Sequence, residues 1–256
     1  MPPETGGLAV NIRSVSFAYP GEPDALRELD WHIPAGARAG LLGASGAGKS
    51  TLLLHLNGIL LPRSGSVQIG ETRVSEQTLP VIRRDVGLVF QNPDDQLFHL
   101  SVAEDLAFGP RNLGWPEAEV QEAVHQTAAA LRLEHLLEKH PQQLSSGEKK
   151  RAALATVLTM NPRVIALDEP FANLDPALIE QLIGMIAALP ATVVLISQSI
   201  LPALACCQTL AVLHEGKITA EGPAFTIARD RALLGRCGLD FHYYQTIWRR
   251  LEEAGF

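Results

Sequence analysis

The sequence is short of several features, and each shortage excludes a class of protein. Three cysteines occur in 256 residues, an odd number without metal-ligand spacing, so we expect reduced thiols. The eight histidines lack such spacing as well. The longest apolar run, residues 52–61, is interrupted by polar residues and is too short to cross a bilayer. The first residues lack the basic and apolar regions of a signal peptide. We therefore expect a cytosolic chain that reaches a membrane only through a partner.

Basic charge is scarce relative to acidic charge. The chain has 21 Lys and Arg against 28 Asp and Glu, and the net charge of −7 argues against a general nucleic-acid-binding protein. In contrast, 46% of the residues are hydrophobic and 19% are charged, the composition of an ordinary globular protein. A chain of 256 residues can bury a sizeable core in one large domain, or in one domain with an added lobe.

Two kinds of strand are indicated by the hydrophobic pattern. Residues 10–18 and 25–33 alternate apolar and polar side chains, which predicts half-buried antiparallel strands. A further strand at residues 38–42 leads into a glycine-rich loop. Buried parallel strands, whose carboxyl ends gather around a ligand site, are predicted by short apolar runs at residues 86–90, 164–167 and 192–196.

A mostly helical stretch, about residues 91–161, separates two of these strands, and we interpret it as an inserted helical lobe. Ser101 with Glu104 predicts a capping box before one helix. Pro116 suits the first turn of a second helix, and Ser146 opens a third that runs to about residue 160.

The last part of the chain predicts a separate appendage. Short strands at residues 210–213 and 218–220 precede a helical, amphipathic segment at residues 221–256. We therefore divide the chain into a main domain at residues 1–220 and a C-terminal helical extension at residues 221–256.

An unbroken G-x-x-x-x-G-K-[ST] motif, a P-loop, stands between the strand at residues 38–42 and a helix at residues 49–57. Its glycines let backbone N–H groups surround phosphates, and the helix directs its positive end at them. Lys49 supplies a charge for the β- and γ-phosphate oxygens, and Ser50 offers a hydroxyl to Mg²⁺. The motif predicts a nucleoside triphosphate site built from Gly43, Ser45, Gly46, Ala47, Gly48, Lys49, Ser50 and Thr51.

Polar residues at other strand ends supply candidates for catalysis and metal binding. Asp168 and Glu169 end an apolar strand, and we interpret Asp168 as holding the metal's water shell and Glu169 as the general base that faces the attacking water. Gln91 follows another strand, where its amide could contact the metal or its water. Tyr19 lies in a turn, where its ring could stack on adenine or pack at the sheet edge.

A second phosphate-binding element occurs at residues 144–148, Leu-Ser-Ser-Gly-Glu, as a glycine- and hydroxyl-bearing entry to a helix. A P-loop followed by this element suggests that two chains close around each ATP. The next residues, Lys149, Lys150 and Arg151, form a short basic run that we interpret as a solvated face.

Taken together, the motifs resemble those of an ATP-binding cassette (ABC) ATPase over nearly the whole chain. The P-loop, the Q-loop residue Gln91, the signature at residues 144–148, the Walker B strand with Asp168 and Glu169, and a D-loop at residues 172–175 occur in the family's order. The resemblance implies an α/β P-loop NTPase core with a mixed sheet, an antiparallel β subdomain and an inserted helical subdomain. It also implies ATP and Mg²⁺ as cofactors.

The family resemblance further implies a head-to-tail dimer. Ser145, Ser146 and Gly147 of one copy would cap the γ-phosphate held by Lys49 of the other, with Asp175 of the D-loop among the nucleotide-contacting residues. The second ATPase subunit could be an identical copy or a paralogue.

Within the family, residues 90–98 and 104–110 resemble the ATPases of energy-coupling-factor importers. The sequences of these two segments are most similar to those of the cobalt and nickel group, and vitamin importers have closely similar segments. This implies a peripheral protein on the cytoplasmic face of the membrane, bound to an integral membrane coupling subunit, and no nucleic-acid partner. Asp94 and Asp95 lie beside the expected docking groove, where they could contact basic side chains of that subunit.

Two residues depart from the family pattern. Ser146 replaces a glycine of the signature, a mild change because its hydroxyl can still reach phosphate. Gln198 stands where the family places a His that bonds the γ-phosphate. Its amide can donate a neutral hydrogen bond but carries no proton or charge, so we expect a slow but real ATPase.

Three other classes of protein remain as alternatives. A soluble ABC protein that acts on DNA or ribosomes would usually carry a long coiled-coil insertion or two cassettes. An ATP-gated scaffold with negligible turnover has Gln198 as its support. A P-loop kinase would leave the signature and the D-loop unexplained.

Overall fold

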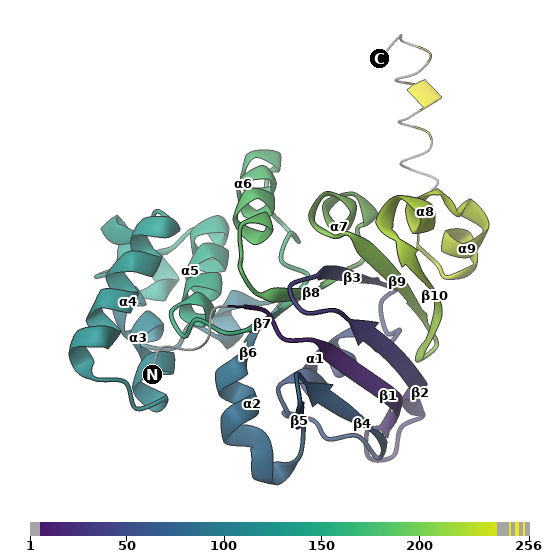
Figure 1. The fold of residues 1–256 in the computed structure, drawn as a ribbon. Helices are drawn as coiled ribbons and strands as arrows, with labels where there is room; N and C mark the ends of the chain where they lie inside the picture. Colours follow the sequence, from purple (N-terminus) through teal and green to yellow (C-terminus); the bar gives the residue numbers. More distant parts are fainter. Residues whose placement is uncertain (1–5, 240–245, 247–248, 251–252, 254–256) are drawn as a thin grey trace.

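Two sheets and their surrounding helices make up the computed structural model, which describes residues 6–239, 246, 249–250 and 253 (Figure 1). The larger sheet has the strand order β10-β9-β3-β8-β7-β6, in which β10 is antiparallel to β9 and the other neighbours are parallel. Its strands are β3 (Arg38–Leu42), β6 (Val86–Val89), β7 (Val164–Asp168), β8 (Thr192–Ser197), β9 (Thr209–His214) and β10 (Lys217–Pro223).

The smaller sheet is antiparallel in the order β2-β1-β4-β5 and packs beside the larger one. Both strands expected here from alternation are present, and the sheet has two more, β4 and β5, that the hydrophobic pattern did not predict. Both strands are short and several of their residues are exposed, so their sequences do not show a clear alternation of apolar and polar side chains. The strands are β1 (Val10–Ala18), β2 (Asp24–Ile33), β4 (Ser64–Ile69) and β5 (Thr72–Arg73).

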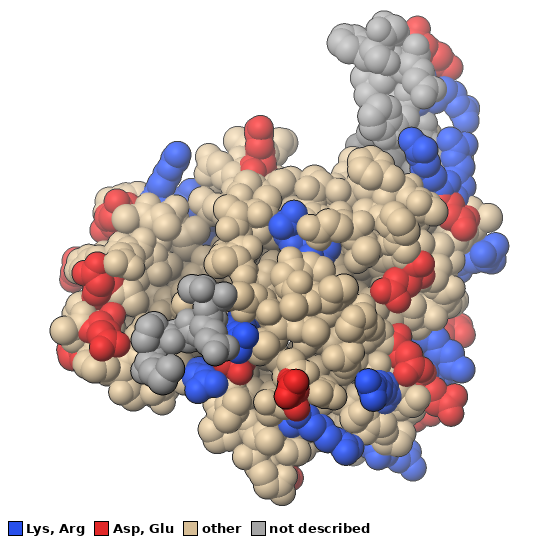
Figure 2. All heavy atoms as spheres, viewed as in Figure 1, with Lys and Arg blue, Asp and Glu red and all other residues tan. Residues whose placement is uncertain are grey.

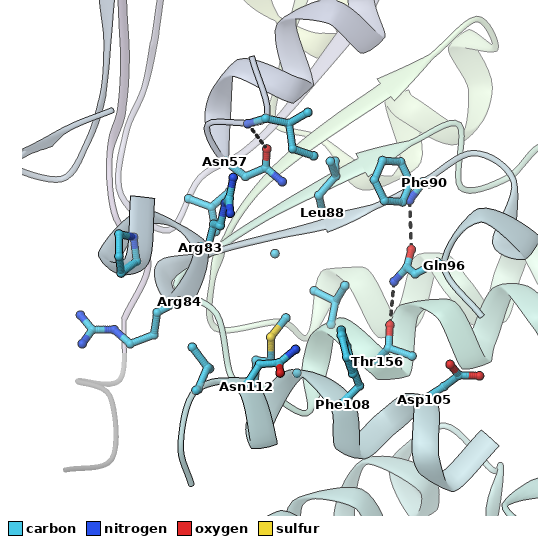
Figure 3. A pocket seen from close by; sticks show the side chains of 18 of the residues that line it. Asn57, Arg83, Arg84, Leu88, Phe90, Gln96, Asp105, Phe108, Asn112 and Thr156 are labelled. Carbon is cyan, nitrogen blue, oxygen red and sulfur yellow. Dashed lines mark hydrogen bonds between the residues drawn. The ribbon is translucent and has the colours of Figure 1, made fainter. Parts of the chain in front are cut away.

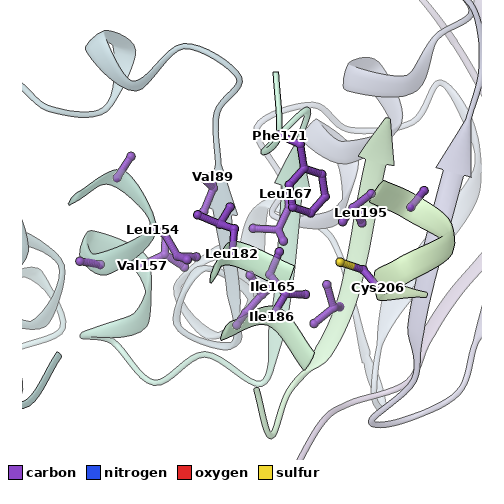
Figure 4. Close-up of a cluster of buried hydrophobic side chains, with 14 of the residues drawn as sticks. Val89, Leu154, Val157, Ile165, Leu167, Phe171, Leu182, Ile186, Leu195 and Cys206 are labelled. Carbon is purple, nitrogen blue, oxygen red and sulfur yellow. The ribbon is translucent and has the colours of Figure 1, made fainter. Parts of the chain in front are cut away.

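Both faces of the larger sheet are buried, which explains why its strands read as continuous apolar runs. Along β7, Ile165 and Leu167 join a cluster with the helices, whereas Val164 and Ala166 join a cluster with the smaller sheet and the first two helices. Figure 4 shows the helical side, where side chains of β6, β7, α5 and α6 meet. Alternate residues of a strand therefore pack against the layers on the two opposite faces of the larger sheet.

Helices fill the rest of the molecule, and three of them form the lobe beside the β6 edge (Figure 1). That lobe contains α3, α4 and α5. The helices are α1 (Lys49–Leu56), α2 (Leu79–Asp85), α3 (Val102–Asn112), α4 (Glu117–Ala130), α5 (Ser146–Leu158), α6 (Pro176–Ala187), α7 (Ile200–Cys206), α8 (Ala224–Arg229) and α9 (Arg231–Arg236).

Helix starts in the lobe follow the predicted capping residues with small differences. Ser101 accepts from the backbone N–H of Glu104 at 3.3 Å, which is one half of the predicted capping box. Pro116 is the N-cap of α4 rather than a residue of its first turn, because its ψ of 140° is extended and helical geometry begins at Glu117. Ser146 is the first residue of α5, as predicted.

The C-terminal part of the structure begins as strand. β10 continues through Pro223 because Glu221 and Gly222 pair with β9, so the first three residues of the segment expected to be helical belong to the sheet. Helices α8 and α9 follow. Most of the predicted helix beyond Leu239 lies outside the described residues.

The surface in Figure 2 mixes acidic and basic side chains, with several acidic ones over the helical lobe and both kinds along the edge formed by the smaller sheet. In the described part of the chain, no helix is long and apolar enough to cross a membrane.

Candidate functional site

The P-loop connects β3 to α1 and has the tight geometry that its glycines permit. Gly48 has a φ of 103°, and a Cβ at this position would lie 2.4 Å from the carbonyl oxygen of Ala25. Lys49 is 6% exposed, and its ammonium donates to the carbonyls of Gly43 at 2.7 Å and Ala44 at 2.9 Å. Burial lowers the pKa of Lys49, while the nearby carboxylates of the Walker B strand oppose that shift. The lysine therefore lies in the hollow of the loop.

A cavity of about 320 Å³ opens above this loop and collects residues from several strand ends. The parallel strands β3, β6, β7 and β8 deliver their carboxyl ends to it, as the strand pattern predicts. Two further residues line it without having been predicted, Glu22 in the turn before β2 and Ala25 in β2 itself. The predicted site residues in its wall are Tyr19, Ser45, Gly46, Gly48, Lys49, Ser50, Thr51, Gln91, Asp168, Glu169 and Gln198.

Two predicted residues lie behind the loop. Ala47 is buried in the core. Gly43 packs against β9, since a Cβ there would lie 2.7 Å from the carbonyl oxygen of Leu213. Neither residue is part of the described lining of the cavity.

Asp168 is the last residue of β7 and Glu169 follows it; both line the cavity, and burial raises the pKa of each carboxyl. A hydrogen bond from Ser50 and the charge of Lys49 oppose the shift at Asp168. Among the described residues, the buried Oδ1 of Asp168 and Oε1 of Glu169 have no hydrogen-bond partner. Unpaired carboxylate oxygens in a nucleotide-sized cavity are suited to a cation and a water molecule.

The residues predicted to bind metal fit Mg²⁺. Ser50, Gln91 and Asp168 line the same cavity, and each offers an oxygen, the ligand atom that Mg²⁺ prefers. The hydrogen bond between Ser50 and Asp168 already brings two of these groups together.

Groups from β8 orient the carboxylate of Glu169. The Ser197 hydroxyl donates to its Oε2 at 3.4 Å, and the Ser197 oxygen accepts from the backbone N–H of Ser199 at 2.9 Å. The backbone N–H of Gln198 also donates to the carboxylate; like the Ser197 bond and the charge of Lys49, it opposes the rise in the pKa of Glu169. Ser197 was missed by the sequence reasoning, although its place at a strand end beside Gln198 was a signal.

Tyr19 lies at the cavity wall with two contacts inside the chain. Its hydroxyl lies 3.3 Å from Oγ1 of Thr51, and its ring meets that of Phe17 edge to face at 5.0 Å. The open face required for stacking on adenine remains a prediction.

The signature and the D-loop lie on a different surface of the chain. In the described structure, Ser145, Ser146, Gly147 and Asp175 do not line the P-loop cavity. Ser145 caps α5 in a reciprocal box with Glu148. Asp175 caps α6 by accepting from Leu178 at 3.0 Å.

The signature meets α6, the helix that follows the D-loop. A Cβ at Gly147 would lie 2.3 Å from a terminal methyl group of Leu178, so the small glycine favours close packing of α5 on α6. The N-termini of α5 and α6 therefore lie together, outside the lining of the P-loop cavity.

The basic run in α5 is not the solvated face that the sequence suggested. Lys149 forms an ion pair with Asp94. Lys150 turns inward, where its ammonium donates to the carbonyls of Glu169 at 3.2 Å and Pro170 at 3.4 Å. Folding placed α5 against the end of β7, a contact that no local pattern encodes.

The fold and the cavity define a P-loop nucleoside triphosphatase. The family model for ABC transporters matches residues 26–172. The chain is 41% identical over 252 residues to the energy-coupling factor transporter ATP-binding protein EcfA of Methanothermobacter thermautotrophicus, covering 96% of this chain and 81% of that protein. It is 43% identical over 231 residues to the cobalt import ATP-binding protein CbiO of Rhodobacter capsulatus, covering 88% and 82%.

Solved structures agree with this result. CbiO1 of Clostridium perfringens, described as part of the ABC transporter complex CbiONQ, superposes with a TM-score of 0.79 at 30% identity and covers 94% of this chain and 98% of that one. The ATP-binding cassette MJ0796, a dimer with ADP and Pi, superposes with a TM-score of 0.76 at 26% identity and covers 84% and 98%. The chain belongs to the ABC transporter family of ATP-binding proteins, and it is an ATPase of the type coupled to transport.

Proposed function

We propose that this chain powers an energy-coupling-factor importer by forming an ATP-dependent dimer that hydrolyses ATP. The observation that carries the proposal is the division of phosphate-binding elements between two surfaces. The P-loop, Gln91, Asp168, Glu169 and Gln198 line one cavity, whereas the signature and the D-loop lie outside it. A second chain, placed head to tail, supplies the missing cap, and the dimeric state of MJ0796 supports this arrangement.

In the closed site each polar group has a distinct role. Lys49 neutralises the β- and γ-phosphate oxygens, and the partner's signature caps the γ-phosphate. Glu169 takes a proton from the attacking water; a bond forms between that water oxygen and the γ-phosphorus, and the bond to the β–γ bridging oxygen breaks to release ADP. Ser50, Gln91 and Asp168 would hold Mg²⁺, which would supply positive charge for the phosphates. Gln198 contributes a neutral donor to the γ-phosphate.

A large groove beside the helical lobe is suited to the membrane coupling subunit. It has a volume of about 770 Å³ and lies between the β6 end, α2 and α3 (Figure 3). Apolar side chains are unusually exposed along its wall: Ile59 at 47%, Val81 at 39%, Phe98 at 62% and Phe108 at 42%. Exposed apolar surface of this kind is typical of a protein interface. A coupling helix of an integral membrane protein would occupy it, which makes this chain peripheral on the cytoplasmic face.

The acidic residues beside the groove have a smaller part in the proposal. Asp94 forms an ion pair with Lys149 of its own chain, whereas Asp95 accepts a neutral hydrogen bond from the Asn92 amide at 3.3 Å. The charge of Asp95 is therefore the better placed of the two to meet a basic side chain of the coupling subunit. Asp95 lines the groove directly.

For the transported substrate, cobalt or nickel is the proposal that the relatives support best, since one of them is named a cobalt import protein. A vitamin importer is the alternative within the same class. A second candidate function is an ATP-gated scaffold with very slow hydrolysis, which the neutral Gln198 favours over a fast enzyme. Turnover that depends on Glu169 distinguishes an ATPase from that scaffold.

The dimer can be tested with a change on the signature surface alone. Ser146 is exposed, so Ser146→Arg should fold normally, bind ATP and fail to dimerise, because the new side chain occupies the face that closes on the partner's nucleotide. Gln126→Arg, an exposed change on α4, adds the same charge away from that face and serves as the control.

Light scattering with and without ATP, in a Glu169→Gln background that slows turnover, gives the readout. We expect ATP-dependent dimers for Gln126→Arg and monomers for Ser146→Arg. ATP-dependent dimers in both proteins would contradict the head-to-tail site.

A further inference from the structure

Two polar side chains attach α5 to the core in addition to its apolar face. Gln96 donates to the carbonyl of Ala153 at 2.8 Å and to the Thr156 hydroxyl at 2.6 Å, and it accepts from the backbone N–H of Phe90 at 3.2 Å (Figure 3). That contact joins the middle of α5 to the end of β6. Lys150 makes the other contact, one turn into the helix, and joins it to the end of β7.

The environment of Lys150 indicates that its contact is specific. Its side chain lines a small apolar cavity with Val89, Leu154, Leu167 and Leu182. Burial lowers the pKa of Lys150, and the nearby charge of Glu169 opposes that shift. A partly buried ammonium loses hydration, so the hydrogen bonds to the two carbonyls must compensate for it.

The carbonyl that Lys150 holds belongs to a residue with an uncommon backbone. Glu169 has a φ of 46°, in the left-handed region that is unfavourable for a residue with a side chain. Its N–H donates to the Ile196 carbonyl at 3.1 Å, and its own carbonyl accepts from the Ala172 N–H at 3.1 Å. Lys150 adds a charged donor to the same carbonyl, from a different part of the fold.

We propose that Lys150 is a positioning residue that fixes the backbone of Glu169 and links this chain's signature helix to its own catalytic carboxylate. The proposal rests on the general-base role of Glu169 given above. α5 starts at Ser146, whose N-terminal turn would bind the γ-phosphate in the partner's site. When that turn moves to cap phosphate, Lys150 transmits the movement to the Glu169 carbonyl. Each chain thereby senses closure of one nucleotide site while it holds the base of the other.

The basic run itself offers no substitute for this contact. Lys149, the preceding residue, is held in an ion pair with Asp94. Within the described part of the chain, loss of the Lys150 ammonium should therefore leave the Glu169 carbonyl with the Ala172 N–H as its hydrogen-bond donor. Small displacements of a catalytic group reduce rates by up to about a hundredfold.

The experiment compares Lys150→Met, Lys150→Gln and Lys150→Arg with Lys217→Met, an exposed lysine on β10, and with Glu169→Gln. We expect Lys150→Met to lower kcat about tenfold and to change KM for ATP by less than about twofold. Lys150→Arg keeps a charged donor and should recover most of kcat, Lys150→Gln should lie between, and Lys217→Met should match the wild type. Thermal unfolding is measured for every variant. If Lys150→Met unfolds at a lower temperature than the wild type, the comparison of kcat between Lys150→Arg and Lys150→Gln decides the test.

Wild-type turnover in Lys150→Met beside an inactive Glu169→Gln would overturn the role of Lys150 and leave the proposed function standing. A raised KM with unchanged kcat, or equal losses in Met, Gln and Arg, would also overturn it, because such results indicate altered ATP binding or general packing. Wild-type turnover in Glu169→Gln would instead contradict the proposed function.

Discussion

At the scale of single residues, the site places two carboxylates of raised pKa next to one lysine. Burial is the main cause of the raised pKa at Asp168 and Glu169, and Lys49 opposes it at both. A base with a raised pKa accepts a proton more readily than an exposed glutamate, and it ionises at higher pH. Ser197, the Gln198 backbone and Lys49 all favour its charged form.

A change at Ser197 tests this arrangement through the pH profile. The hydroxyl bond to Glu169 lowers the pKa of the carboxyl, so Ser197→Ala should raise that pKa further. Because the ionised form is the active base in the proposed mechanism, the acid limb of the kcat profile should move to higher pH. Turnover on that limb should fall about threefold to tenfold, with less change at alkaline pH. Ser199→Ala, which keeps the backbone N–H bonded to Ser197, is the matched control. An acid limb unchanged in Ser197→Ala would show that the hydroxyl does not act on Glu169.

Gln198 provides a second test at this scale. Its side chain lines the cavity, and a histidine at this position could add a charged or proton-carrying donor to the γ-phosphate. We expect Gln198→His to raise kcat about tenfold with Glu169 intact, and to have no effect in a Glu169→Gln background. Steady-state phosphate release measures both. A Gln198→His protein that hydrolyses ATP no faster would show that Gln198 does not limit the rate.

At the scale of elements, those defined by local sequence patterns could be predicted, whereas contacts between distant parts of the chain could not. The P-loop, the buried parallel strands and the signature helix were predictable, because glycines, apolar runs and capping residues act over a few positions. Helices α2, α6 and α7 were not predicted; α7 has only seven residues, too few for a clear helical period. The inward turn of Lys150 depends on where α5 meets β7, which no neighbouring residue specifies.

The attachment of α5 to β6 predicts a stability effect that can be localised. Gln96→Leu removes both hydrogen bonds to α5 and the acceptor for the Phe90 N–H. We expect a loss of about 1–3 kcal/mol in the free energy of unfolding. Hydrogen exchange should quicken in α5 and at the β6 end, with the smaller sheet unaffected. Gln126→Leu on the exposed face of α4 is the control. Exchange rates in α5 and at the β6 end that are the same in Gln96→Leu as in the wild type would contradict a joining role for Gln96.

At the scale of the whole molecule, the nucleotide cavity, the signature surface and the groove are three separate surfaces joined by α5. The helix begins at the signature, contacts Glu169 in its second turn and contributes Thr156 and Val157 to the groove. A membrane subunit in the groove and a second ATPase on the signature surface would therefore act on the same element. Whether the second ATPase is an identical copy or a paralogue decides if both sites carry Gln198.

The groove gives a prediction that separates coupling from chemistry. Phe98 is 62% exposed, forms an edge-to-face contact with Phe108 and lines the groove. Phe98→Ser should leave the turnover of the isolated chain unchanged and weaken binding to the membrane subunits by about tenfold or more, since exposed aromatic residues often dominate such interfaces. Phe225→Ser, an equally exposed aromatic on α8, is the control. Copurification and transport by the Phe98→Ser complex at wild-type levels would contradict the assignment of the groove.

The most direct test of the account is ATP turnover per chain as a function of protein concentration, for the wild type and Glu169→Gln. A site completed by a second chain predicts that turnover per chain rises with concentration and then reaches a plateau. The account also predicts that Glu169→Gln lowers the plateau by roughly 10²–10⁴-fold while ATP binding persists. Turnover per chain that is independent of concentration down to the most dilute samples, or that survives in Glu169→Gln, would contradict it.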